Sequence, residues 1–141
     1  MSKNTIPLTR SHADTILDSV ADGVFTVNKD MVITYFNKAA ARITGMPQKK
    51  AVGQFCFEVL KSNICETKCP IRFSFKTGKE IIDQHKNIIR VDGKKIPITS
   101  SSSIHKDDKG NMIGGVETFR DLSKIKALEK EIQKKYTFED I

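Results

Sequence analysis

The chain has 141 residues, which is enough for one domain with a short extension and for a substantial buried core. Its 38% hydrophobic and 29% charged residues are typical of a globular protein, and no apolar run approaches the ~20 residues of a transmembrane helix. The first residues lack the apolar core of a signal peptide, so we expect a cytoplasmic protein that does not contact a membrane. The net charge of +7 comes from scattered lysines and arginines rather than an organised cluster, which argues against direct nucleic-acid binding.

The N-terminal part is expected to contain a flanking helix. Residues 1–8 are expected to be disordered, whereas residues 9–20 carry Ile16, Leu17 and Val20 at helical spacing. This apolar stripe serves either a dimer interface or the domain's own core.

A β-hairpin and a capped helix are predicted next. Apolar residues alternate over residues 23–36 with a polar turn at Lys29-Asp30, which is typical of two antiparallel strands. Asn37 follows at the position of a helix N-cap, and Gly45 is placed to end a helix over residues 38–44.

The middle of the chain is predicted to be helical. Short turns lead to a helix over residues 54–60, and a loop follows over residues 65–69. Pro70 is favoured in the first turn of a helix, so the next helix is expected from Pro70 to Gly78.

Three strands are predicted in the last third of the chain, over residues 80–91, 94–105 and 112–119. Asp92-Gly93 is a strong hairpin signal between the first two, and a polar turn over residues 107–111 separates the last two. Within the second strand, the run Ser100 to Ser103 could line a ligand cavity, form a subunit contact or simply be solvated sheet.

The sequence DGVFTVNKDMVITYFNKAAARITG at residues 22–45 resembles the opening of a PAS domain, and the later elements follow the PAS order. The resemblance covers about residues 17–123. It implies an α+β fold with a five-stranded antiparallel sheet, helices on one face, and N-terminal and C-terminal flanking helices. It also implies a module that senses small molecules, redox state or light, or that dimerises. We therefore expect the sensor domain to occupy residues 9–122.

A signalling helix is predicted after the last strand. The Arg120–Ser123 segment resembles the family's domain exit, where a carboxylate, here Asp121, caps the outgoing helix. Beyond it, a narrow apolar seam flanked by Lys and Glu is typical of a short coiled coil; it consists of Leu122, Ile125, Leu128, Ile132 and Tyr136. We expect residues 123–136 to pair in a homodimer, the alternative being a helix that lies back on its own domain.

The last six residues, Tyr136 to Ile141, resemble the segment that leads into the AAA+ ATPase domain of sigma-54-dependent (NtrC-type) bacterial transcription activators. The resemblance implies that residues 137–141 begin a linker to an ATPase domain outside this chain, which itself contains no G-x-x-x-x-G-K-[ST] motif. The implied partners are that AAA+ domain and sigma-54 RNA polymerase, with ATP binding and DNA binding belonging to the parent protein. A histidine kinase of a two-component system or a cyclic-di-nucleotide enzyme is the alternative output.

The three cysteines, Cys56, Cys65 and Cys69, lie within fourteen residues in the pattern C-x8-C-x3-C-P. Thiolates suit an iron–sulfur cluster or zinc, with the fourth ligand from His85, a second subunit or solvent. Alternatively, Cys69 at a helix N-terminus is a reactive thiolate that Cys65 or Cys56 resolves as a disulfide. A third interpretation is that Cys56 packs in the core and the other two have no role.

Other cofactors and catalysis are disfavoured. Haem-binding PAS domains use a histidine after this segment, and none lies between Gly53 and Glu80. The photoactive flavin members carry Asn-Cys-Arg-Phe-Leu-Gln, of which GQFCFEVL shares only the Cys-Phe pair. No H-E-x-x-H, G-x-S-x-G or C-x-x-C motif occurs, so we expect a regulatory domain rather than an enzyme.

Overall fold

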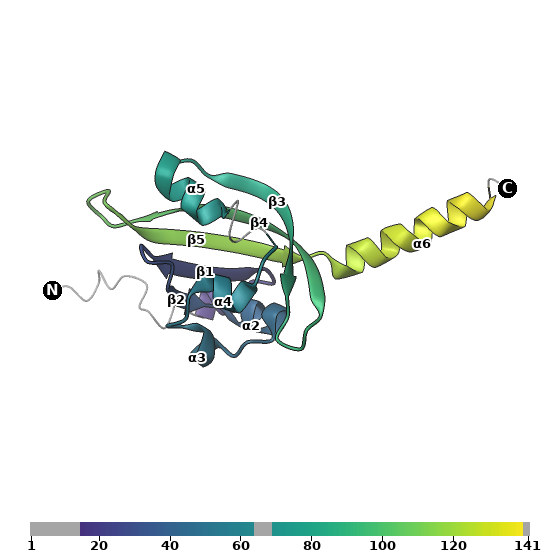
Figure 1. Cartoon of the computed structure of the whole chain (residues 1–141), viewed down its shortest axis with the longest axis horizontal. Helices are drawn as coiled ribbons and strands as arrows, with labels where there is room; N and C mark the ends of the chain where they lie inside the picture. The colour runs from purple at the N-terminus through teal and green to yellow at the C-terminus, as the bar shows by residue number, and fades with distance from the viewer. Residues whose placement is uncertain (1–14, 64–68, 140–141) are drawn as a thin grey trace.

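Residues 15–63 and 69–139 are described by a computed structural model (Figure 1). Residues 15–18 are helical and precede the first strand, as expected for part of the flanking helix. The further elements, in chain order, are β1 (Gly23–Asn28), β2 (Ile33–Phe36), α2 (Lys38–Thr44), α3 (Gln48–Ala51), α4 (Cys56–Leu60), α5 (Pro70–Thr77), β3 (Ile81–Ile89), β4 (Lys95–Lys106), β5 (Met112–Asp121) and α6 (Ser123–Glu139).

The strands form one antiparallel sheet in the order β2-β1-β5-β4-β3. The last strand, β5, lies at the centre of the sheet, because it pairs with β4 on one side and with β1 of the first hairpin on the other. The connection between β2 and β3 carries the helices α2 to α5 over one face of the sheet (Figure 1). The predicted α+β fold, with its five-stranded antiparallel sheet and flanking helices, is confirmed.

The hydrophobic core lies between this face and the helices. The Phe25 ring is its centre, with ring centroids 6.3 Å from Phe36 and 6.1 Å from Phe119. Each such ring contributes roughly 1.5–3 kcal/mol by leaving water. Aliphatic residues from the sheet and helices complete the core, among them Val27, Ile33, Val59, Leu60, Ile71, Ile88 and Ile98.

Asn37 is the N-cap of α2, as predicted, and it also joins three other segments. Its side-chain oxygen accepts from the N–H groups of Ala40 at 2.8 Å and Val24 at 2.9 Å. Its amide nitrogen donates to the carbonyls of Leu17 and Asp22, each at 3.0 Å. Because Asn37 is fully buried, these bonds hold the flanking segment, β1 and α2 together.

The predicted polar turn at Lys29-Asp30 is present, with the Met31 N–H donating to the Asn28 carbonyl at 3.0 Å, but the hairpin loop is one residue longer than predicted. The strand β2 begins only at Ile33, and Met31 has a φ of 68° in the left-handed region. That backbone costs about 1–2 kcal/mol for a residue with a Cβ. It places the Met31 side chain in the core at 6% exposure, so the burial offsets the strain.

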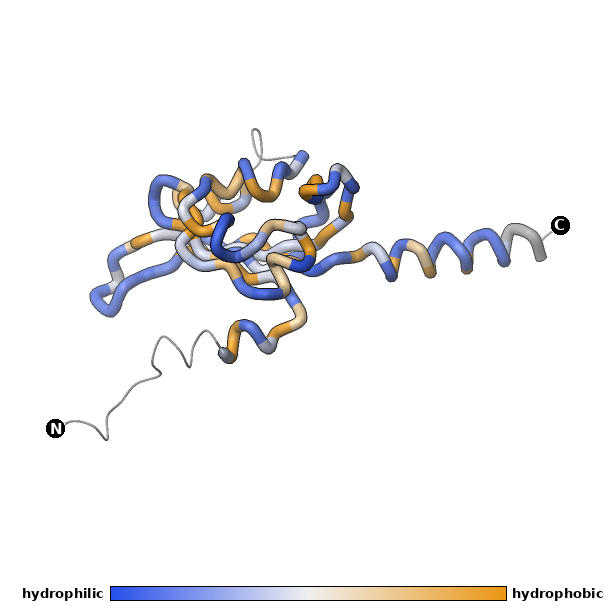
Figure 2. Tube along the Cα trace, turned by 90° about the horizontal axis from the view of Figure 1, so that it is seen from below, coloured by the Kyte–Doolittle hydropathy of each residue, from blue (hydrophilic) through white to orange (hydrophobic). Residues whose placement is uncertain are grey.

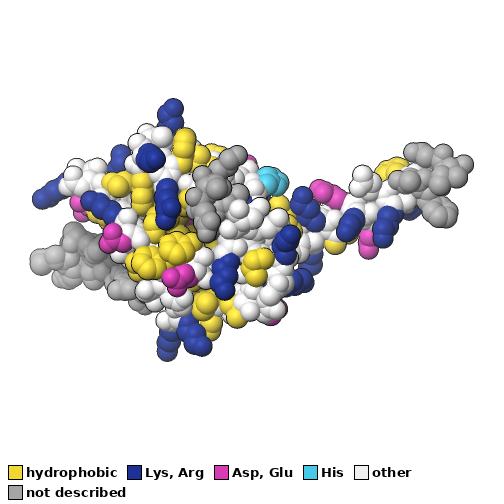
Figure 3. All heavy atoms as spheres, in the orientation of Figure 1, with side chains coloured by type: hydrophobic (Ala, Val, Ile, Leu, Met, Phe, Trp, Pro, Cys, Tyr) yellow, Lys and Arg dark blue, Asp and Glu magenta, His cyan; other side chains and the backbone are white. Residues whose placement is uncertain are grey.

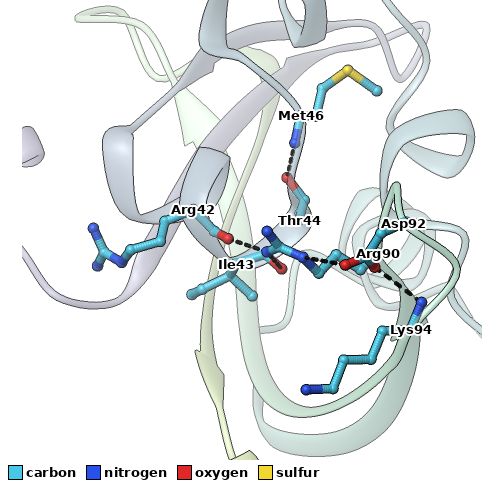
Figure 4. A network of polar contacts seen from close by, with 7 residues as sticks. All are labelled: Arg42, Ile43, Thr44, Met46, Arg90, Asp92 and Lys94. Atoms are coloured by element: carbon cyan, nitrogen blue, oxygen red, sulfur yellow. Dashed lines mark hydrogen bonds and ion pairs between the residues drawn. The ribbon is translucent and has the colours of Figure 1, made fainter.

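The end of α2 is tied to the β3–β4 hairpin (Figure 4). Gly45 ends the helix with a φ of 79°, as predicted. The Arg90 guanidinium donates to the carbonyls of Arg42 and Ile43, the free acceptors of the last turn, and pairs with Asp92 at 3.3 Å.

The remaining predicted elements are present with shifted ends. The predicted 54–60 helix is the shorter α4, and α3 was not predicted as a helix. The helix α5 carries Pro70 in its first turn and ends at Gly78, as predicted. The three later strands match β3, β4 and β5 to within about two residues at each end.

The helix α6 leaves the end of β5 and projects away from the sheet (Figure 1). It continues to Glu139, through residues 137–139 that the sequence assigned to a linker. Hydrophilic segments dominate α6, with hydrophobic ones recurring along it (Figure 2). None of the helices in the described part of the chain has the length and apolarity to cross a bilayer.

Candidate functional site

A buried ion pair lies on the face of the sheet that the helices cover. Lys86 of β3 and Glu117 of β5 contact each other at 3.0 Å between Nζ and Oε2, with side chains only 3% and 2% exposed. Successive side chains of a strand alternate between its two faces, so Lys86 faces the same side as Ile88 and Glu117 the same side as Phe119. Both of these neighbours are buried in the core. The pair therefore places two charges inside the domain.

The strand β4 lies between them and contributes two buried hydroxyls. Ser102 is in register with Glu117, and Ser100 with Phe119. Lys86 is in register with Ile98, so the ion pair crosses the inner face of β4 at Ser100. Ser100 and Ser102 are 2% and 3% exposed, and neither hydroxyl has a hydrogen-bond partner among residues 15–63 and 69–139.

The helix α5 packs against β4 and β5 and adds a third buried hydroxyl. Ser74 is fully buried, and its hydroxyl also lacks a hydrogen-bond partner in the described part of the chain. The helix approaches the sheet closely at Gly115, where a Cβ would come within 2.8 Å of Ile71 and 3.2 Å of Phe75. We call Ser74, Lys86, Ser100, Ser102 and Glu117 the buried polar cluster.

The electrostatics of this cluster are set by burial. Burial raises the pKa of the Glu117 carboxyl, and the nearby Lys86 ammonium opposes that rise. Removing one partner of such a pair typically costs about 3–5 kcal/mol, because a buried charge is left uncompensated. Each unpaired buried hydroxyl costs roughly 1–3 kcal/mol in lost hydration. The cluster is therefore held at a cost to stability, as expected of a site that meets another polar group.

The serine run of β4 alternates between two environments. Ser100 and Ser102 face the helices, as the cavity interpretation requires. Ser101 and Ser103 face the other side and are only half-buried, and the Ser101 hydroxyl accepts from the Asp83 N–H at 3.1 Å. The solvated-sheet interpretation therefore does not apply to the inward pair.

Sequence reasoning did not single out Lys86 or Glu117. Both occupy positions whose neighbours at i+2, Ile88 and Phe119, are apolar and buried. This alternation is the sequence signal that could have identified them, because a charged residue two positions from a buried apolar one on a strand faces the same side of the sheet. The pairing of the two residues depends on the strand order, which places β4 between them.

The cysteines are placed only in part. Cys56 is the first residue of α4 and is buried against the apolar core, and Cys69 is the half-buried N-cap residue of α5. Cys65 lies outside the described residues. Within residues 15–63 and 69–139, no three His, Cys, Asp or Glu side chains gather as metal ligands. His85 is exposed on β3. The metal and redox hypotheses for Cys56, Cys65 and Cys69 therefore stay predictions.

Two exposed phenylalanines lie next to Cys56 at the start of α4. Hydrophobic side chains gather on the face of the molecule turned to the viewer in Figure 3. Phe55 and Phe57, which flank Cys56, stack with ring centroids 5.2 Å apart and are 40% and 38% exposed.

The start of α6 is fixed to the sheet, whereas its seam is not covered. The Asp121 carboxylate accepts from the Ser123 N–H at 2.8 Å, and the Leu122 N–H donates to the Pro97 carbonyl at 2.8 Å. Leu122 is buried, but the later seam residues are at least 49% exposed; they are Ile125, Leu128, Ile132 and Tyr136. The seam therefore does not lie back on the domain in this structure.

Comparison with known proteins identifies the family. The profile of the PAS domain family matches residues 21–124. The sensor protein CitS of Halalkalibacterium halodurans is 30% identical over 121 residues, which is 84% of this chain and 20% of that protein. The chain thus spans about a fifth of the length of this relative.

Two solved structures share the fold. A PAS domain of a protein from Colwellia psychrerythraea superposes with a TM-score of 0.69 at 17% identity, over 81% of this chain and 97% of that one. An RNA-binding light-oxygen-voltage receptor superposes with a TM-score of 0.72 at 16% identity, over 99% of this chain and 41% of that one. At these identities the likeness concerns the fold alone. The chain belongs to the PAS domain family, whose members are signal-sensing modules.

Proposed function

We propose that this chain is the sensory and dimerising domain of a sigma-54-dependent transcription activator, acting in the cytoplasm and signalling through α6. One observation carries the proposal: a single strand joins the buried polar cluster to the signalling helix. The strand β5 contributes Glu117 to the cluster and then passes through Asp121 and Leu122 directly into α6.

The route of the signal follows from this connection. A ligand or redox signal in the domain interior displaces the part of β5 that carries Glu117, where its ladder with β4 is regular from Ile98–Asp121 to His105–Gly114. The bond from Leu122 to Pro97 passes that shift to the first turn of α6. The signal changes an equilibrium only if it binds one of two arrangements more tightly.

The proposed dimer forms through the α6 seam. The exposed seam residues recur at spacings of three and four, which lets two helices bury them against each other. A seam of about two heptads is marginal alone, so it stays sensitive to the state of the attached domain.

Sedimentation velocity tests the seam. We expect the double variant Ile125→Asp and Ile132→Asp to be monomeric at concentrations where the parent is dimeric, because two carboxylates cannot be buried unpaired. The control variant Ala127→Asp and Lys134→Asp places carboxylates on the opposite face of α6 and should stay dimeric. Equal dimerisation of the seam variant and the parent would refute the proposed stalk.

The identity of the output domain is supported by residues 136–141, which resemble the segment leading into an AAA+ ATPase domain. The proposal predicts that the gene continues after Ile141 with a G-x-x-x-x-G-K-[ST] motif, and that the full protein assembles with sigma-54 RNA polymerase. Sequencing the coding region downstream tests this, and continuation without such a motif would exclude the activator.

A second candidate output is a sensor histidine kinase. It is favoured by the 30% identity to the sensor protein CitS. In that case a phosphate-accepting histidine and a kinase ATP-binding domain would follow the helix instead of the P-loop. The same sequencing experiment separates the two candidates.

A redox or metal signal at Cys56, Cys65 and Cys69 is a further proposal for what this domain senses. The half-buried position of Cys69 at the start of α5 supports it, because the thiol is only partly covered. Protein purified without oxygen should then show a visible absorption band or contain iron, zinc or acid-labile sulfide. Colourless, metal-free protein whose three thiols alkylate at the same rate before and after mild oxidation would exclude this signal.

A further inference from the structure

The buried polar cluster has unused hydrogen-bonding capacity on both sides of the domain interior. The sheet supplies the hydroxyls of Ser100 and Ser102, and α5 supplies that of Ser74; none of the three has a partner within the described residues. The Lys86 ammonium carries three donors, of which Glu117 takes one at 3.0 Å. Native interiors rarely leave several buried polar atoms unpaired at one place.

The sheet register places four of these groups side by side, and Ser74 is buried on α5, which packs against β4 and β5. Ser100 lies beneath the line from Lys86 to Glu117, and Ser102 lies beside Glu117 in the register of the sheet. The helix α5 faces them from the other side and is close to the sheet at Gly115. Any molecule that meets these groups is therefore small.

The charge of the cluster restricts what it can hold. Lys86 and Glu117 neutralise each other, so the interior carries no net charge when both are ionised. An ion brought into this site would leave an uncompensated charge in a low-dielectric interior. An apolar molecule would leave the three hydroxyls unpaired.

We propose that the buried polar cluster binds a small polar molecule without net charge, such as an amide, which both donates and accepts hydrogen bonds. This inference rests on the proposed sensory function and names the chemical class of its signal. The amide oxygen accepts from Lys86 and the serine hydroxyls, and the amide nitrogen donates to Glu117. The binding step forms and breaks only hydrogen bonds.

Three probes of equal shape test the charge preference: acetate, acetamide and acetamidinium near neutral pH. Their dissociation constants are measured by titration of the backbone amide NMR signals of Ser100 and Ser102. We expect acetamide to bind at least about tenfold more tightly than either ion, since burial of a net charge opposes both. Equal or tighter binding of an ion, or no shift with any probe at molar concentration, would overturn the proposal.

Charge-changing variants give a readout that a merely structural role would not produce. Glu117→Gln leaves Lys86 uncompensated and should shift the preference to acetate. Lys86→Met removes the positive charge beside Glu117 and should shift the preference towards acetamidinium, whichever protonation state the carboxyl then adopts. An unchanged order of the three probes in folded variants would contradict the proposal.

Serine variants keep the test decisive if a charge variant fails to fold. Ser100→Ala and Ser102→Ala should leave the melting temperature unchanged or raise it, because an unpaired hydroxyl is removed, yet weaken acetamide binding about fivefold or more. Ser103→Ala, on the other face of the same strand, should change neither. Equal acetamide affinity in all three variants would refute the site. The sedimentation test of the α6 seam uses no probe, so it tests the proposed sensory function independently of this result.

Discussion

At the scale of residues, the Lys86–Glu117 pair sets the character of the domain interior. An ion pair with side chains 3% and 2% exposed gains little stability, because desolvation of both charges opposes their attraction. Loss of either partner nevertheless destabilises the folded protein, because the other charge is then buried without a partner. The same position filled by two apolar residues would be compatible with the surrounding core, so the pair indicates a role other than stability.

A double-mutant cycle tests this view. We expect Lys86→Met and Glu117→Leu each to lower the free energy of unfolding by about 3–5 kcal/mol, because each leaves one buried charge unpaired. The double variant should lose much less than the sum of the two. Denaturant titrations measure all four proteins, and additive losses would contradict a coupled pair.

The pH dependence of stability follows from the raised pKa of Glu117. In the unfolded chain this carboxyl has its ordinary value near 4.5, whereas burial raises the pKa in the folded protein. Between these values the folded state binds more protons, so the free energy of unfolding should rise as the pH falls through the folded pKa towards 4.5.

The comparison protein for this measurement is Lys86→Met with Glu117→Gln, in which the buried carboxyl is absent and no charge is left unpaired. The pKa values of Asp92 and Asp107 are lowered, so protonation of these two carboxylates reduces the free energy of unfolding only below their ordinary pKa of 3.8. Both proteins share that effect. Parallel stability curves for the two proteins down to pH 4.5 would contradict the buried carboxylate.

At the scale of elements, local signals in the sequence predicted most of the architecture. The cap at Asn37, the stops at Gly45 and Gly78 and the proline of α5 are each decided by a few adjacent residues, and each is where the sequence placed it. The turn at Met31 was not predictable in this way, because its left-handed backbone is sustained by burial against residues distant in the chain.

The candidate site was predictable only in part for the same reason. Alternation along one strand places Ser100 and Ser102 on one face, but it does not say which face the helices cover. The partnership of Lys86 with Glu117 depends on the sheet order β5-β4-β3, a property of the whole fold. Cys65 lies outside the described residues, so the cysteine prediction is not tested.

The close approach of α5 to the sheet is a feature of two elements together. Gly115→Ala would place a Cβ within 2.8 Å of Ile71, so α5 must move outward. We expect a loss of about 1–3 kcal/mol in the free energy of unfolding, as is usual for overpacking. The variant Gly115→Ala with Ile71→Ala should lose less than the sum of the single changes, whereas strict additivity would mean that α5 does not contact this strand.

At the scale of the whole molecule, we expect the state of the domain interior and the dimerisation of α6 to depend on each other. The strand that carries Glu117 leads into the helix that carries the seam, so a change in the interior should alter association between chains. Couplings of this kind typically change affinity about 5- to 150-fold. A domain that merely dimerises would not show this dependence.

The most direct test is the dimer dissociation constant of Glu117→Gln, measured by sedimentation equilibrium beside the parent and the outer-face control Ser103→Ala. All three proteins are compared at a temperature where each is folded by circular dichroism. We expect Glu117→Gln to change the constant at least about fivefold and Ser103→Ala to leave it unchanged. Constants that agree within about twofold for all three proteins would contradict the coupling between the interior and α6.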